Sequence, residues 1–267
     1  MYRVIRGDSA PVAAPEVMNM SILVCKFGGS STANAECLER VRAILAASPA
    51  RRCAVLSAPG VDARHGEKVT TQLTECWRSR RDRRGRRALT DSVARRFGEI
   101  ASGLGVAGFY DIAKSEIEAA LKVSEAQAVS RGEYLCALLF SKYTGIDMED
   151  AARLVAFDER GGLNVQRTLG RFIALSRGRD RVVVPGFYGA EPSGRIRVFP
   201  RNGSDITGAL AAAGMGASLY ENWTDVPGSS GLIVQHSRVG IPADATGSRQ
   251  AGCSTCAPAR ASARIWR

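Results

Sequence analysis

The sequence lacks the long apolar runs that mark membrane proteins. No stretch reaches the ~18 consecutive apolar residues that suggest a spanning helix. Asp8 and Glu16 interrupt the first 20 residues, where a signal peptide would be continuously apolar. We therefore expect residues 1–20 to be a disordered leader, and we expect no membrane partner.

A disulfide framework is also missing. The seven cysteines are odd in number and most lie in apolar contexts, which favours reduced thiols and a cytoplasmic location. Cys253 and Cys256 form a single C-x-x-C pair without a second pair or a nearby histidine. Because a structural metal site needs a full set of ligands, we predict no metal held by protein side chains.

The positive charge is confined to two segments. Residues 78–96 contain nine Arg and two Asp, and residues 229–267 contain five Arg and one Asp, so these two segments carry the whole net charge of +11. Basic stripes that bind nucleic acid usually include aromatic residues or a reading motif. Only Trp77 and Phe97 flank the first segment. A solvated, Arg-rich helix or loop is therefore favoured, and nucleic acid is an unlikely partner.

The order of apolar segments indicates an α/β fold. The 267 residues suffice for one large domain or two small ones. Residues 21–25 and 53–57 are predicted strands, and residues 33–47 between them show helical spacing, which predicts a parallel sheet with crossover helices. We further predict helices at 134–143, 168–176 and 209–215, strands at 152–157, 181–184 and 219–223, and a hairpin strand at 196–199. Residues 229–267 are rich in Ser, Gly, Ala, Pro and Arg and are expected to be a disordered tail.

One segment is suited to holding phosphate. Lys26-Phe27-Gly28-Gly29-Ser30-Ser31 stands between the first predicted strand and the first predicted helix. Two glycines let the backbone approach an anion, and amides at a helix start can point at phosphate. Lys26 adds a mobile charge. Because the spacing matches neither the Walker pattern nor G-x-G-x-x-G, a tight turn with an incidental lysine stays open as the alternative.

A second polar segment precedes the small-residue helix. Arg201 offers a planar fork suited to a carboxylate. Ser204, Asp205 and Thr207 are predicted to cap the helix start. The plain alternative is a capped helix without a ligand.

Three weaker signals lie elsewhere. Thr224 and Asp225 end the last predicted strand, and the carboxyl ends of parallel strands commonly host ligands. Glu133 stands at the start of an apolar helix, where it could hold an amino group or favour the helix dipole. Ser57 and Thr70 flank a polar stretch of the kind that a substrate loop uses. A turn, a helix-end charge and a surface loop are the respective alternatives.

Taken together, these segments resemble the aspartate kinase family of the amino acid kinase fold. The matching pieces are KFGGSS, VLSAPG, KVT, SRGEYL, VVPGFYGA, RNGSDITGA and YENWTDVPG, over residues 21–228. The resemblance implies a three-layer α/β sandwich with a mainly parallel central sheet, and a catalytic domain at 21–228. It also implies transfer of the γ-phosphoryl group of MgATP to the β-carboxylate of L-aspartate, the first step toward lysine, threonine and methionine, with a possible homo-oligomer.

The resemblance implies a role for each matching residue. Lys26 and Asp205 are the implied catalytic pair. The implied ATP-binding residues are Lys26, Gly28, Gly29, Ser30, Thr224 and Asp225. The implied aspartate-binding residues are Ser57, Thr70, Glu133, Arg201, Gly203 and Ser204. A carboxylate is already a nucleophile, so the reaction chiefly needs neutralised charge and alignment of two anions.

The sequence departs from the family in two places. Asn202 stands where the family usually has glycine, and asparagine tolerates a positive φ better than most residues. After Gly228 the family's Asp-Pro-Arg motif, its remaining sheet elements and its ACT region have no counterpart. We therefore expect a C-terminally incomplete domain, through a frame change or truncation. An inactive nucleotide-binding fragment and another amino acid kinase of this fold are the alternatives.

Overall fold

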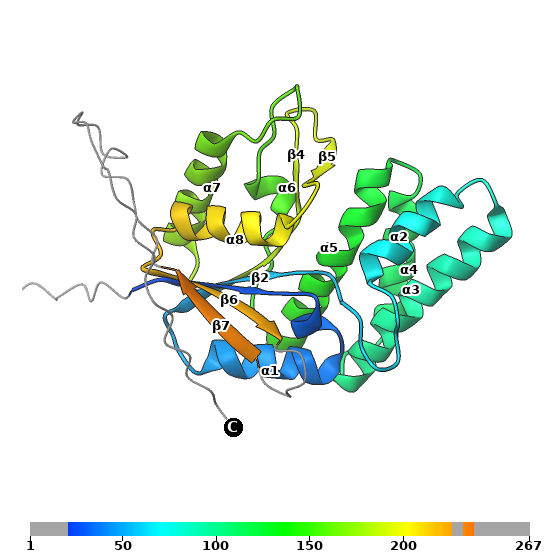
Figure 1. Ribbon diagram of the computed structural model, residues 1–267, viewed down its shortest axis with the longest axis horizontal. Helices are drawn as coiled ribbons and strands as arrows, with labels where there is room; N and C mark the ends of the chain where they lie inside the picture. Colours follow the sequence, from blue (N-terminus) through cyan, green and yellow to red (C-terminus); the bar gives the residue numbers. More distant parts are fainter. Residues whose placement is uncertain (1–20, 226–231, 238–267) are drawn as a thin grey trace, which may run out of the picture.

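Residues 21–225 and 232–237 are described by a computed structural model, in which a five-stranded sheet has helices on both faces (Figure 1). The strand order is β3-β2-β1-β6-β7. These strands are β1 (Leu23–Phe27), β2 (Arg51–Leu56), β3 (Val182–Pro185), β6 (Leu219–Asp225) and β7 (Leu232–Ser237). All neighbouring pairs are parallel except β6 and β7. The predicted α/β sandwich with a mainly parallel sheet is confirmed.

The helices form two layers and a lateral group. α7 (Val165–Gly178) and α8 (Gly203–Gly214) lie on one face of the sheet and α1 (Ala35–Ala46) lies on the other (Figure 1). The lateral group consists of α2 (Val69–Arg78), α3 (Arg83–Gly103), α4 (Phe109–Ala120) and α5 (Glu125–Thr144). The short elements are the 3-10 turn η1 (Ser30–Thr32), α6 (Ala151–Leu154) and the antiparallel hairpin of β4 (Tyr188–Ala190) and β5 (Ile196–Val198). None of the described helices combines the length and apolar character needed to cross a membrane.

Alternation along β1 decides which side chains face which layer. Successive residues of a strand point to opposite faces. Cys25 and Phe27 belong to the core on the α1 side, whereas Val24 packs in the second core with Phe172 of α7. Lys26 shares the face of Val24, so the strand directs its ammonium group toward the α7–α8 layer.

The parallel register brings the carboxyl ends of four strands to one edge. Phe27 is paired with Leu56 on one side and with Trp223 on the other, and Leu56 is paired with Pro185. The loops after β1, β2 and β3 therefore start beside one another. In open α/β sheets this edge is where ligands bind.

Several element predictions need correction. The predicted strand at 152–157 is instead the end of α6 followed by isolated bridges at Ala156 and Phe157. Within the tail predicted to be disordered, residues 232–237 form β7 and pair with β6. The predicted leader, residues 1–20, and the tail residues 229–231 and 238–267 lie outside the described residues.

Phe172 joins the α7–α8 layer to the sheet, and its truncation should destabilise the fold. The side chain is fully buried, and α8 approaches so closely that a Cβ added at Gly214 would lie 2.5 Å from the Phe172 Cβ. We expect Phe172→Ala to lower the free energy of unfolding by about 3–5 kcal/mol, because it leaves a cavity. The exposed neighbour Ile173 is the control, and Ile173→Ala should change the value by less than about 1 kcal/mol. Urea unfolding measures both, and equal losses would contradict the packing described.

Candidate active site

The turn after β1 is shaped to admit an anion. The Gly28 N–H donates to the Trp223 carbonyl at 3.2 Å, and a Cβ added at Gly28 would lie 3.6 Å from the Lys26 Nζ. A Cβ added at Gly29 would come within 3.1 Å of the Ala58 carbonyl oxygen. The predicted helix start is here the 3-10 turn η1, and α1 begins later, capped by Asn34, whose side chain accepts from the Cys37 N–H. Gly28 thus leaves space beside the Lys26 ammonium, whereas Gly29 permits the close approach of the loop after β2.

Lys26 forms an ion pair with Asp205. The Nζ–Oδ1 distance is 2.7 Å; Lys26 is 8% exposed, whereas the Asp205 side chain is 40% exposed. Asn222, which is paired with Lys26 across β1 and β6, donates from Nδ2 to the same Asp205 oxygen at 3.3 Å. The pair therefore has one side in the protein and one side open to solvent or ligand.

Asn222 is a site residue that the sequence did not reveal. Its neighbours Thr224 and Asp225 were the predicted ligands at the end of β6. Asn222 and Lys26 lie 196 positions apart, and only the register of β1 against β6 shows that they meet. The available signal was that Asn222 alternates with Thr224 on one face of the strand.

The start of α8 differs from the predicted cap. The helix begins at Gly203, its N-cap residue Asn202 has a φ of 49°, and no side chain caps the end. The expectation that Asn202 tolerates a positive φ is confirmed, but the predicted capping by Ser204, Asp205 and Thr207 is wrong. The Asp205 carboxylate instead forms an ion pair with Lys26, and the Thr207 hydroxyl donates to the Gly203 carbonyl at 2.9 Å.

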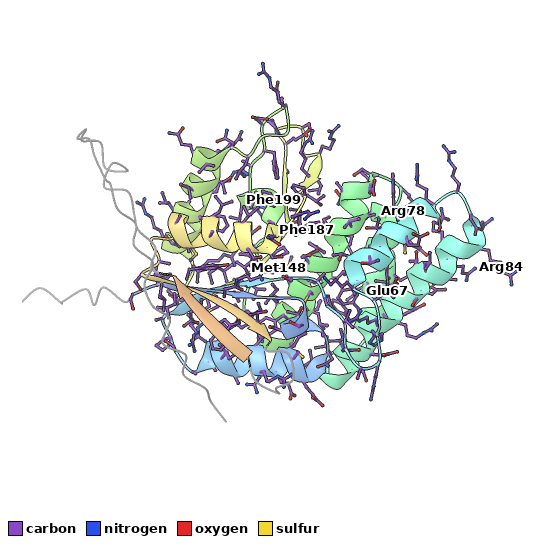
Figure 2. The ribbon with its side chains drawn as sticks, viewed as in Figure 1. Glu67, Arg78, Arg84, Met148, Phe187 and Phe199 are labelled. Atoms are coloured by element: carbon purple, nitrogen blue, oxygen red, sulfur yellow. The ribbon has the colours of Figure 1, made fainter. Side chains whose placement is uncertain are left out.

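Ser204 and Gly203 lie where the loop after β3 meets α8. Ser204 is buried, and a Cβ added at Gly186 would lie 2.6 Å from its Oγ. A Cβ at Gly203 would lie 2.8 Å from the Phe187 Cα. Figure 2 shows Phe187 and Phe199 close to this end of α8. Phe187 itself has a φ of 78°, a strained value for a bulky side chain.

Glu133 has a buried carboxyl group with one unpaired oxygen among the described residues. It lies inside α5 and not at its start, which corrects the predicted position. The residue is 4% exposed, and burial raises the pKa of its carboxyl to about 8. The Ala58 backbone N–H donates to this carboxyl, yet its Oε2 has no hydrogen-bond partner among the described residues. A cation such as an ammonium group would satisfy it.

The other predicted substrate residues divide into two places. Ser57 follows β2, and its N–H donates to the Phe27 carbonyl at 3.1 Å. Thr70 lies in the first turn of α2, which is held by a 3.1 Å hydrogen bond from the Val69 N–H to the Pro59 carbonyl. Both therefore flank the loop that contacts Glu133.

Arg201 is exposed and makes no ion pair or side-chain hydrogen bond with the described residues.

Two clusters therefore meet at the sheet edge. The first is Lys26, Gly28, Gly29 and Asp205, with the half-buried Ser30 and Thr224 beside the same turn. The second contains Ser57, Thr70 and Glu133, whose chain neighbours meet: a Cβ added at Gly132 would lie 2.9 Å from the Ala58 Cβ and 3.4 Å from the Val69 Cγ1. A 2.7 Å hydrogen bond from the Gly60 N–H to the Gly29 carbonyl links them. Asp225 is the last residue of β6 at this edge.

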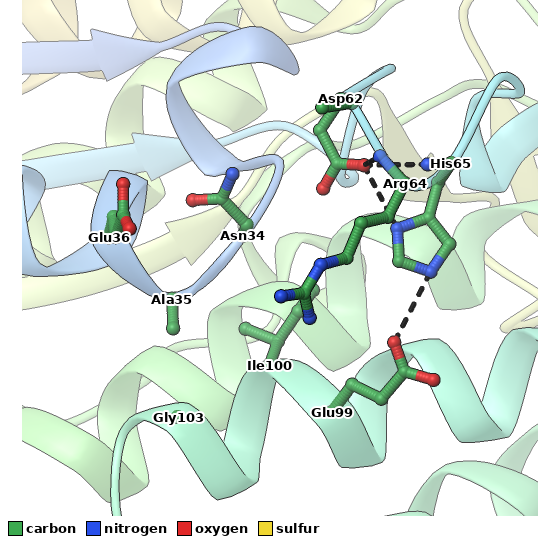
Figure 3. Close-up of a pocket in the computed structure, with 10 residues that line it drawn as sticks. Asn34, Ala35, Glu36, Asp62, Arg64, His65, Glu99, Ile100 and Gly103 are labelled. Atoms are coloured by element: carbon green, nitrogen blue, oxygen red, sulfur yellow. Dashed lines mark hydrogen bonds and ion pairs between the residues drawn. The ribbon is translucent and has the colours of Figure 1, made fainter.

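A separate cavity of about 360 Å³ lies next to the site and is drawn in Figure 3. None of the predicted site residues lines it. His65 lines this cavity. Its Nδ1 lies 3.0 Å from the Asp62 Oδ1, and its Nε2 lies 3.4 Å from the Glu99 Oε2. Within the described part of the chain, no group of three or more His, Cys, Asp or Glu could hold a metal ion.

A turn with two glycines at the edge of a parallel sheet, beside a lysine–aspartate ion pair, is an arrangement suited to an anionic ligand. Comparison with protein families is more specific: the model described as the amino acid kinase family matches residues 21–228, and the chain belongs to this family. The chain is 33% identical to aspartokinase 3 of Bacillus subtilis over 220 residues, covering 76% of this chain and 48% of the relative. It is 29% identical to the lysine-sensitive aspartokinase 3 of Escherichia coli, covering 78% and 49% respectively.

The chain is also similar to solved structures of aspartate kinases. The aspartate kinase of Clostridium acetobutylicum is similar with a TM-score of 0.72 and 32% identity, covering 78% of this chain and 49% of that one. Aspartokinase III of Escherichia coli, solved with aspartate and ADP, has a TM-score of 0.62 and 25% identity, over 78% of this chain and 50% of that one. The chain spans about half the length of the curated relatives that it matches.

The raised pKa of Glu133 predicts a pH dependence of stability. In the folded chain the carboxyl keeps its proton up to about pH 8, whereas in the unfolded chain it ionises near its ordinary pKa of 4.5. The unfolded state therefore binds fewer protons between these values, and stability falls as the pH rises through this window. Relative to Glu133→Gln, the wild-type loss should reach up to roughly 5 kcal/mol, at about 1.4 kcal/mol per pKa unit.

Urea unfolding at a series of pH values between 4.5 and 8 measures this difference. Glu39→Gln is the matched control, because Glu39 is exposed on α1 and its variant should follow the wild-type curve. Parallel wild-type and Glu133→Gln curves would show that the carboxyl is already ionised and would contradict the described burial.

Proposed function

We propose that this chain carries an aspartate kinase active site, which transfers the γ-phosphoryl group of MgATP to the β-carboxylate of L-aspartate. The observation that carries the proposal is the Lys26–Asp205 ion pair beside Gly28, in a chain that also buries the Glu133 carboxyl with an oxygen that lacks a partner among the described residues. Membership of the amino acid kinase family and the similarity to aspartokinases support it.

The phosphate side of the site is made by the turn after β1. Lys26 would hold the transferring phosphates, with Gly28, Gly29 and Ser30 lining them and Thr224 and Asp225 on the nucleotide side. The open space at Gly28 and the half-exposed Asp205 fit an anionic group and its counter-ion. Bound Mg²⁺ would supply neutralisation of phosphate charge, and the exposed side of Asp205 is the carboxylate placed to meet it.

The substrate side would hold aspartate at both of its ends. Glu133 would face the amino group, since an ammonium ion satisfies its unpaired oxygen and lowers the pKa of its carboxyl. Arg201 would pair with a carboxylate through its fork, and Ser57, Thr70, Gly203 and Ser204 would line the remaining space. Neither Arg201 nor Asp205 needs to move a proton in this arrangement.

The chemistry then needs alignment more than acid–base catalysis. An oxygen of the β-carboxylate attacks the γ-phosphorus, and the bond from that phosphorus to the β–γ bridging oxygen breaks. The products are β-aspartyl phosphate and ADP, with no net proton transfer. Lys26 stabilises charge on the transferring group while Glu133 and Arg201 keep the nucleophile in line. A cytoplasmic role at the start of lysine, threonine and methionine synthesis belongs to the same proposal.

Lys26→Ala should remove most of the turnover. Loss of a phosphate-stabilising charge is expected to lower kcat on the order of 100-fold or more. Lys122, which is exposed between α4 and α5, is the matched control, and Lys122→Ala should keep wild-type turnover. A coupled assay for ADP release, with aspartate and then with glutamate, measures both variants. Near-normal turnover of Lys26→Ala would contradict the assignment, and release with glutamate alone would favour a different kinase of the fold.

Arg201→Ala should act on substrate binding. Because the side chain is exposed and makes no ion pair within the described residues, its removal should leave stability unchanged within about 0.5 kcal/mol. The KM for aspartate should rise about 10-fold or more, the effect of losing a charge-assisted pair, while the KM for ATP changes little. Arg160→Ala, at another exposed arginine, is the control. An unchanged KM for aspartate would remove Arg201 from the substrate site.

A further inference from the structure

One arginine of the Arg-rich segment is not a surface residue. Figure 2 shows Arg78 and Arg84 at the outer end of the α2–α3 hairpin, consistent with the solvated helix predicted for residues 78–96. Arg96, the last residue of that segment, is instead only 1% exposed, so the prediction is wrong for this residue. A guanidinium group is expensive to bury and needs strong partners.

The partners of Arg96 are three backbone carbonyls from three different segments. Nη1 donates to the Glu67 carbonyl at 2.7 Å, and Nη2 donates to the Gly60 carbonyl and to the Ala33 carbonyl, the latter at 3.4 Å. No carboxylate in the described part of the chain forms an ion pair with it. The planar fork of arginine, with several donors in fixed directions, can serve such a set, whereas the single ammonium of lysine cannot match it.

Each of these carbonyls belongs to a segment that forms the site. Ala33 directly follows η1, the turn that contains Ser30. Gly60 is in contact with the proposed phosphate turn, residues 26–31, because its N–H donates to the Gly29 carbonyl at 2.7 Å and a Cβ at Gly60 would lie 2.6 Å from the Gly29 carbonyl carbon. Glu67 lies one residue before Lys68, the N-cap of α2, whose first turn contains Thr70.

A second residue of α3 contacts the same loop, between Gly60 and Glu67. Glu99 lies three positions after Arg96 and is 3.4 Å from the His65 Nε2, while His65 contacts Asp62 of the loop (Figure 3). Arg96 thus donates hydrogen bonds to the two ends of the Gly60–Glu67 segment, and Glu99 contacts the segment at His65.

We propose that Arg96 is a positioning residue for the phosphoryl transfer, which fixes the phosphate turn, the loop after β2 and the start of α2 relative to one another. The proposal rests on the proposed function for its effect on turnover. Its structural part is independent of that function. Arg96 acts through backbone carbonyls and does not touch either substrate.

Arg96→Met tests the proposal, with the neighbouring exposed arginine as control in Arg95→Met. Hydrogen exchange of the native proteins should become at least about tenfold faster at residues 28–33 and 57–70 in Arg96→Met, the size expected for lost charge-assisted hydrogen bonds. Exchange in β3 should stay unchanged. In the aspartate-dependent assay the same variant should lose about tenfold or more in kcat with a smaller change in the KM for aspartate. Arg95→Met should match the wild type in both measurements.

The outcomes separate the two proposals. Equal exchange in Arg96→Met and Arg95→Met, or an increase that extends equally to β3, would overturn the positioning role. A wild-type chain without aspartate-dependent turnover would count against the proposed function only, because the exchange comparison still decides the role of Arg96. If Arg96→Met does not fold, Arg96→Lys replaces it; the same local increase in exchange supports the proposal and wild-type exchange overturns it.

Discussion

The 2.7 Å contact between the Lys26 ammonium and the Asp205 carboxylate connects the end of β1 to the first turn of α8. The rest of the site depends on that connection. Side-chain alternation turns Lys26 toward the α7–α8 layer, and the parallel register of β1 and β6 adds Asn222 to the same carboxylate. Gly28 then leaves room beside the ammonium, so charge and space for an anion arise together.

Two buried groups complete the arrangement in opposite ways. Arg96 places a charged group in the interior, where it donates hydrogen bonds to backbone carbonyls of three segments of the site. Glu133 is buried with an oxygen that lacks a partner among the described residues, and burial raises the pKa of its carboxyl. The first group holds the site in shape without a ligand. The second would be stabilised by a cationic group, which is the role proposed for the amino group of the substrate.

Local patterns in the sequence predicted much of this structure. The turn after β1 could be predicted because a strand, two glycines and a helix-like segment are adjacent in the chain. The strand predicted at 152–157 was wrong because a short apolar run does not distinguish a strand from a buried helix end. The capping role predicted for Asp205 failed because Lys26, which is distant in sequence, binds the carboxylate. Arg96 was hidden within a segment whose composition describes a solvated surface, and β7 was hidden in a tail with the composition of a disordered segment.

The Lys26–Asp205 site is proposed to join phosphate to a carboxylate of aspartate. Acyl phosphates react with hydroxylamine to give hydroxamates, so trapping with hydroxylamine reports on the bond that the site is proposed to form. We expect the chain, MgATP and L-aspartate together to give aspartyl hydroxamate, and we expect omission of either substrate to abolish it. Binding of ATP without any hydroxamate from aspartate would contradict the account and would identify the chain as an inactive nucleotide-binding fragment.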